Sequence, residues 1–314
     1  MKETKRLIIF LVLTFAITWA LEFLVVYPIS EKYGYGKNII SQGIVAAMMF
    51  VPALCVLLTR LFTREGFNNS QLTLNLGKGR TRYYFIAWFL PAILCSLGAV
   101  AFFLMSPELF DTGHSYLINQ NAEMGVTLSP EQINDKVVIG VIMAVFLSPL
   151  LNVITCFGEE WGWRGYMMPK LLGKMKFVPA VIVGGLIWGL WHAPIIALGH
   201  NYGTDYAGAP WAGIAMMCLF CVVLGTLFTW WCVKAGNCWP AIIGHGAING
   251  FAGVPLYFLA DNKLPLLGPT AAGLVGMSAL IVAVFVVIAI QAREARKEAL
   301  VAASAVVEES TVAE

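Results

Sequence analysis

Long apolar stretches alternate with short polar segments along the whole chain. Eight of them are long enough to cross a bilayer, because a helix needs about 20 mostly apolar residues to span the hydrocarbon. They cover residues 7–28, 39–60, 83–105, 137–160, 179–199, 211–233, 239–259 and 270–290. Their length and near-continuous apolarity favour helices over the shorter, alternating strands of a membrane barrel. The sequence therefore predicts an all-α, polytopic membrane bundle of about eight transmembrane helices.

Composition supports the same class. Hydrophobic residues make up 59% of the chain and charged residues 12%, with 10 Trp and 19 Phe. The mean hydropathy of +0.77 excludes an ordinary soluble globular domain. The seven cysteines lie mostly within the apolar stretches, where a thiol behaves as a small hydrophobe, so no disulfide framework is expected.

Basic residues predict the orientation of the bundle. With the N-terminus in the cytoplasm, all but four of the 20 basic residues fall on the inner side, and the exceptions are Lys32, Lys37, Lys136 and Lys263. This asymmetry follows the positive-inside rule and predicts that both termini are cytoplasmic. The formal net charge is only +2, and no basic patch suggests that the protein binds nucleic acid.

No internal repeat divides the chain. We expect residues 1–295 to form one bundle, with a retained first span, and residues 296–314 to be a cytoplasmic tail that is disordered or loosely helical. In the acidic loop 106–136, Ser129 before Pro130 predicts the start of a helix. The oligomeric state cannot be predicted from the sequence.

Three charged residues follow one of the predicted spans, in "GEEWGWRGYMMPKL" at residues 158–171. Residues four apart share a helix face, so Glu160 and Arg164 are expected to pair. Glu159 lies about 100° away and would then face the bundle, free for chemistry. The alternative is that all three charges lie in the interface as ordinary snorkelling groups.

Two histidines occur inside later spans. His192 follows Trp188 by one turn in "GGLIWGLWHAP", where Gly185 and Gly189 form a face that permits close helix approach. A hydrogen-bonding or packing role is the alternative to a catalytic one for His192. The histidines at positions 114 and 200 are expected to have no functional role.

The second of these histidines is His245. It shares a helix face with Asn249 in "CWPAIIGHGAING". Glycines surround both side chains, so that another backbone or a substrate could approach closely. A purely packing role is therefore the weaker alternative at this position.

Glu22, in the first span, is expected to snorkel or to make a structural hydrogen bond, with a place in a substrate groove as the alternative. Counting along ideal helices puts Glu159 and His245 at about 9 Å depth and His192 at about 18 Å. The three residues are thus predicted to be neighbours only if the helices are tilted or end at other positions than the ideal straight spans.

A carboxylate and two histidines on three helices are suited to amide hydrolysis. Glu159 could activate a water with His192, while His245 and Asn249 donate hydrogen bonds to the oxyanion. Alternatively, Glu159, His192 and His245 could bind a zinc ion that activates the water. Because no H-E-x-x-H motif is present, the sequence leaves open whether the cofactor is zinc or none.

The ordered set "EEWGWR", "WGLWH" and "HGAIN" resembles the three motifs of the CPBP family of intramembrane proteases, which includes type II CAAX prenyl endopeptidases and bacteriocin-processing enzymes. The motifs span about residues 159–249. The resemblance implies that Glu159 is the catalytic glutamate, supported by Glu160 and Arg164, and that His192 helps to activate water. It assigns His245 and Asn249 to oxyanion stabilisation. Trp188 stands where the family usually has Phe, which implies a pocket of altered shape.

The resemblance implies an intramembrane endopeptidase that cleaves a membrane-associated peptide or protein tail within the lipid bilayer. If the source is a bacterium, the location is its plasma membrane, and a peptide or bacteriocin precursor is a better substrate than a prenylated protein. One rival is a non-catalytic membrane scaffold or bacteriocin self-immunity protein that uses the same cavity. A transporter with a proton relay is the other, but it predicts a symmetry that the sequence lacks.

Overall fold

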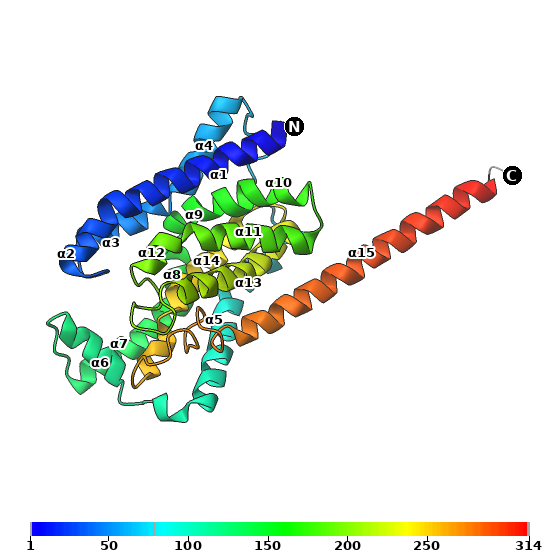
Figure 1. Ribbon diagram of the computed structural model, residues 1–314. Helices are drawn as coiled ribbons and strands as arrows, with labels where there is room; N and C mark the ends of the chain where they lie inside the picture. Colours follow the sequence, from blue (N-terminus) through cyan, green and yellow to red (C-terminus); the bar gives the residue numbers. More distant parts are fainter. Residues whose placement is uncertain (1, 78, 313–314) are drawn as a thin grey trace.

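The computed structural model describes residues 2–77 and 79–312, and all regular secondary structure in these ranges is helical. The bundle surrounds one large apolar core, and the long helix α15 projects away from it (Figure 1). The elements in chain order are α1 (Lys2–Leu21), η1 (Glu22–Val26), α2 (Tyr27–Tyr33), α3 (Ile39–Met48), α4 (Val51–Thr63), α5 (Arg82–Met105), η2 (Pro107–Leu109), α6 (Ser115–Glu123), α7 (Pro130–Ile142), η3 (Met143–Leu147), α8 (Ser148–Leu151), α9 (Val153–Gly162), η4 (Trp163–Met167), α10 (Met168–Leu172), α11 (Phe177–Trp191), α12 (Ala193–Ala197), α13 (Trp211–Ala235), α14 (Trp239–Phe251), η5 (Val254–Phe258) and α15 (Ser278–Val312).

The all-helical membrane bundle predicted from the sequence is confirmed. Within the described residues, five helices are long and apolar enough to cross a bilayer, or six if the bent pair of α3 and α4 is one span. The five cover Lys2–Tyr33, Arg82–Met105, Pro130–Leu151, Trp211–Ala235 and Ser278–Lys297. This count is lower than the predicted eight, because the remaining apolar stretches form shorter helices. The orientation of the termini stays a prediction.

The shorter helices lie in the region that carries the sequence motifs. The apolar run predicted over 137–160 breaks at Asn152, and a separate helix begins at Val153. The run predicted over 179–199 is interrupted at His192, and α14 has only 13 residues. Broken helices at membrane depth are tolerated where protein surrounds the freed backbone groups, and here they position polar side chains inside the bundle.

Glycines allow this packing. A Cβ at Gly158 would lie 2.4 Å from the Met49 carbonyl oxygen, at the break between α3 and α4. A Cβ at Gly250 would lie 2.2 Å from the Ser148 Cβ on α8. The glycines around His245 predicted that a backbone or a substrate comes close to this helix. In the structure, neighbouring helices fill that space.

The predicted small-residue face of α11 is confirmed. A Cβ at Gly185 would lie 2.4 Å from the Cα of Val222, and one at Gly189 would lie 2.4 Å from the Cα of Cys218. Both partners belong to α13, the most buried of the long helices. Helices α11 and α13 therefore pack backbone to backbone, which positions the end of α11 where His192 lies.

The peripheral segments follow their sequence signals. Ser129 caps α7 through a capping box with Gln132, as the Ser-Pro pair predicted. Helix α15 continues to Val312 through most of the segment predicted as a loosely ordered tail, and residues 313–314 lie outside the described residues. These segments lie away from the motif region (Figure 1).

Substitution of Gly189 by Ala should destabilise the fold, because the added methyl group meets the α13 backbone and one helix must move. Overpacking of this kind costs about 1–3 kcal/mol, so we expect a lower midpoint in thermal unfolding of the purified protein. Gly43→Ala is the matched control, since a Cβ there has nothing within 4 Å. An unchanged midpoint for Gly189→Ala would contradict the close α11–α13 packing.

Candidate functional site

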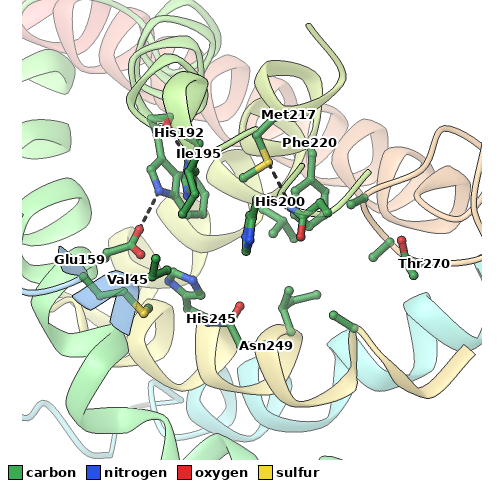
Figure 2. A pocket seen from close by; sticks show the side chains of 18 of the residues that line it. Val45, Glu159, His192, Ile195, His200, Met217, Phe220, His245, Asn249 and Thr270 are labelled. Carbon is green, nitrogen blue, oxygen red and sulfur yellow. Dashed lines mark hydrogen bonds between the residues drawn. The ribbon is translucent and has the colours of Figure 1, made fainter. Parts of the chain in front are cut away.

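A cavity of about 450 Å³ opens within the bundle, and the predicted site residues line it. Glu159 enters from α9, Trp188 and His192 from the end of α11, and His245 and Asn249 from α14. Figure 2 shows Glu159, His192, His245 and Asn249 around this space. The structure thus brings together residues that helix counting placed at different depths, because α11 ends at His192 and α9 is a separate helix.

The predicted pair of Glu160 and Arg164 is present. Arg164 Nη1 lies 2.9 Å from both carboxylate oxygens of Glu160, and His245 Nδ1 lies 2.9 Å from Glu160 Oε1. Glu160 is 0% exposed, and Arg164 and His245 are also buried. Burial at this level is incompatible with snorkelling. The pair instead joins α9 and η4 to α14 through His245.

Aromatic rings surround the guanidinium of Arg164. Its Cζ lies 4.1 Å from the centroid of a Trp188 ring and 5.3 Å from that of Phe228. Cation–π attraction is strongest where water is excluded, so these rings help to stabilise a buried cation. Gly225 leaves the space that Nη2 needs, because a Cβ there would lie 3.1 Å from it.

Glu159 has a different environment from that of its neighbour. It is 2% exposed, and its Oε2 accepts hydrogen bonds from the indole nitrogens of Trp188 at 2.8 Å and Trp163 at 3.3 Å. Its Oε1 has no hydrogen-bond partner among the described side chains and backbone groups. One oxygen is therefore fixed, while the other remains free to contact a water or a substrate in the cavity.

This role of the tryptophans was not predicted from the sequence, where Trp188 was expected only to change the pocket shape and Trp163 was not a candidate. The contact between Trp163 and Glu159 could have been predicted from their spacing, because residues four apart lie on the same helix face. The contact from Trp188 joins two helices, and nothing local in the sequence predicts it.

His192 occupies the C-terminal end of α11. Its Nδ1 lies 2.9 Å from the backbone oxygen of Trp188. Because a carbonyl oxygen can only accept, Nδ1 must carry the proton, and Nε2 of the neutral ring is then an acceptor. The ring also packs against Trp191, with centroids 4.7 Å apart. A fixed tautomer of this kind suits a residue that orients a water.

His245 and Asn249 lie one turn apart on α14, as predicted. Since Glu160 accepts from Arg164, His245 Nδ1 donates to it, which leaves Nε2 for other partners. Asn249 is exposed to the cavity, and its Nδ2 makes only a weak contact of 3.8 Å with Cys156 Sγ. The Asn249 amide is therefore available as a donor to a bound group.

The zinc site considered from the sequence would use Glu159, His192 and His245. In the described part of the chain, no three His, Cys, Asp or Glu side chains come together in a group that could hold a metal ion. The Nδ1 atoms of the two histidines bond to Glu160 and to the backbone of Trp188, so only their Nε2 atoms are left to face the cavity. Because the three side chains do not come together as one group, the described residues do not fit the proposed zinc set.

Two further titratable residues line the cavity. Glu22 lines it, which agrees with the alternative of a place in a substrate groove rather than with snorkelling. His200 lines it as well, and its Nδ1 lies 2.9 Å from the Tyr35 hydroxyl. His114, by contrast, bonds the backbone oxygen of Tyr257 outside the cavity, which agrees with a structural role.

Comparison with known proteins points to one family. Residues 138–251 match the family model for Rce1-like type II CAAX prenyl endopeptidases. A curated relative, "CAAX prenyl protease 2" of Methanococcus maripaludis, is 34% identical over 93 residues, which is 29% of this chain and 34% of the relative. The chain thus matches about a third of that relative's length. These matches confirm the resemblance to the CPBP family predicted from the three motifs.

Removing one partner of the buried ion pair should be far more damaging than removing a surface charge. Arg164→Ala leaves Glu160 buried without its main counter-ion, which typically costs about 3–5 kcal/mol. We expect a strongly lowered midpoint in thermal unfolding. The matched control is Lys263→Ala, which breaks the exposed Lys263–Asp261 pair, and exposed pairs contribute at most about 1 kcal/mol. Similar midpoints for the two variants would contradict a structural role of the buried pair.

Proposed function

We propose that this protein, whose residues 138–251 carry the CPBP-family match, is an intramembrane endopeptidase that hydrolyses a peptide bond of a membrane-associated peptide or protein tail. One observation carries the proposal. Glu159 is a buried carboxylate with one oxygen fixed by two indole N–H groups and the other free, in a cavity shared with two histidines and an asparagine. Hydrolysis requires this combination of a base, a positioned water and oxyanion donors.

In the proposed reaction, a water lies between Glu159 Oε1 and His192 Nε2. Glu159 takes one proton from this water as the water oxygen attacks the carbonyl carbon of the substrate. A tetrahedral oxyanion forms. The proton then passes to the amide nitrogen, the C–N bond breaks, and a carboxylic acid and an amine leave. The fixed tautomer of His192 allows its Nε2 to accept a hydrogen bond from the water and so orient it.

Asn249 and His245 are the proposed oxyanion donors. The Asn249 amide faces the cavity with only a weak sulfur contact to displace. His245 can donate from Nε2 only when its ring carries both protons, since Nδ1 already donates to Glu160. In that form, Glu160 is its counter-ion. Removal of one oxyanion donor typically lowers the rate by about 10²–10³.

The substrate is a peptide or membrane-protein tail that reaches the cavity from the bilayer. Location in a bacterial plasma membrane remains a prediction. The alternative function, a non-catalytic scaffold or bacteriocin self-immunity protein, predicts a different result. Such a protein would bind a peptide in the cavity without cleaving it.

Glu159→Gln should abolish cleavage, because an amide cannot accept the proton from water. Loss of a general base typically lowers the rate by about 10²–10⁴. The test uses purified protein in lipid bilayers with a library of membrane-embedded reporter peptides, and mass spectrometry of the products. Exposed Glu31→Gln is the matched control and should cleave like the wild type.

A Glu159→Gln variant that cleaves at the wild-type rate would contradict the proposal. A strong chelator added to the wild type is a second arm of the same assay. We expect the rate to be unchanged by the chelator, and loss of activity that zinc restores would instead support a metal mechanism.

Trp188→Phe should lower the rate of cleavage without abolishing it. Phe keeps the aromatic ring against Arg164 but loses the N–H that fixes Glu159 Oε2. A hydrogen bond to a charged group contributes about 1.5–3 kcal/mol, so we expect kcat to fall about 10- to 100-fold with KM nearly unchanged. The control is Trp211→Phe at an exposed position. A change confined to KM would indicate that Trp188 only shapes the pocket.

A further inference from the structure

A second carboxyl group, that of Glu22, lines the same cavity as the residues assigned to hydrolysis. Glu22 is 2% exposed, and its Oε2 is buried without a hydrogen-bond partner among the described residues. It begins η1, a π-helical turn that interrupts the first helix, and such turns occur frequently at functional sites. A buried, unpaired carboxylate is unfavourable, so its presence in a cavity requires an explanation.

The contacts of the first helix place Glu22 relative to His192. Thr18 accepts a hydrogen bond from the Trp191 indole at 2.9 Å, and Trp19 donates one to the Trp191 backbone oxygen at 3.2 Å. Glu22 is four residues after Thr18, which is about 6 Å further along the helix. An extended peptide rises about 3.3 Å per residue, so Glu22 is within reach of a substrate side chain a few residues from the scissile bond.

The cavity is lined by two carboxyl groups, those of Glu22 and Glu159, and by no Lys or Arg side chain of the described residues. Arg164 is turned toward Glu160 and away from this space. His200 also lines the cavity, but its Nδ1 contacts the Tyr35 hydroxyl rather than a carboxylate. Apart from the histidines, no basic side chain in this lining would pair with a negatively charged group of a substrate.

We propose that Glu22 forms a subsite that binds a cationic group of the peptide substrate, either a Lys or Arg side chain or an N-terminal ammonium. This inference rests on the proposed function and names the class of its substrate. A bound cation supplies the missing partner of the carboxylate, and the buried setting strengthens the attraction. A substrate that presents a C-terminal carboxylate at this position is disfavoured by the same charges.

Peptide binding to the cleavage-deficient Glu159→Gln protein in lipid bilayers tests this inference without depending on catalysis. The probes are apolar peptides, capped at both ends, with one Lys scanned over the central positions, and matched peptides with norleucine or Glu in its place. An uncapped norleucine peptide separates an N-terminal ammonium from a side-chain cation. We expect one lysine position, or the free amine, to bind at least 10-fold more tightly than capped norleucine.

Glu22→Gln in the same background should reduce that preference to about onefold, and Glu22→Lys should favour the Glu peptide. Glu31→Gln, at an exposed position, should retain the preference. Thermal unfolding of each variant verifies that it is folded. A preference that survives Glu22→Gln overturns the proposal, as does equal binding of the Lys, norleucine and uncapped peptides. A third outcome is that all peptides bind equally, and that their affinity falls for Glu22→Ala but not for Glu22→Gln. This outcome would also overturn the proposal and would indicate that Glu22 acts as a neutral hydrogen-bonding group.

The two proposals can fail separately. If the wild type shows the Glu22-dependent preference but cleaves none of the bound peptides, the subsite is supported and the endopeptidase proposal is not. If it cleaves peptides without regard to their charge, the endopeptidase proposal stands and the subsite is overturned.

Discussion

The site depends on the buried ion pair between Glu160 and Arg164. A carboxylate that is 0% exposed must be compensated, because an uncompensated buried charge is strongly destabilising. Arg164 supplies that compensation from the next turn, and His245 adds a hydrogen bond from another helix. The same contact holds a proton on Nδ1 of His245 and directs Nε2 to other partners. One pair therefore neutralises Glu160, orients a histidine and leaves Glu159 as the carboxylate available for chemistry.

Short, broken helices make room for this arrangement. Helices α9, α11 and α14 end or begin inside the bundle, so that side chains from three elements meet at one depth. Glycines then bring the backbones together at places where any Cβ would collide, as at Gly158 and Gly189. The outcome is a mainly apolar cavity that carries a few polar side chains, in which other protein groups satisfy the backbone at the breaks.

Local signals predicted much of this site. The i, i+4 pair of Glu160 and Arg164, the glycine face of α11 and the shared face of His245 and Asn249 all follow from helical periodicity. The break at Asn152 does not follow from periodicity, because the apolar run continues through it. The predicted depth of His192 was wrong for a related reason, since the spans were assumed to be straight and unbroken. The indole contact from Trp188 to Glu159 and the inward position of Glu22 are tertiary features. Periodicity along one helix carries no information about them.

The central claim is that Glu159 activates a water against a peptide bond held in this cavity. The most direct test is the structure of the cleavage-deficient Glu159→Gln protein with an uncleaved peptide bound in a bilayer. We expect the scissile carbonyl carbon to lie beside residue 159, with room for one water between them, and the carbonyl oxygen to face Asn249 and His245. A peptide bound outside the cavity, or with its carbonyl oxygen directed away from these donors, would contradict this claim.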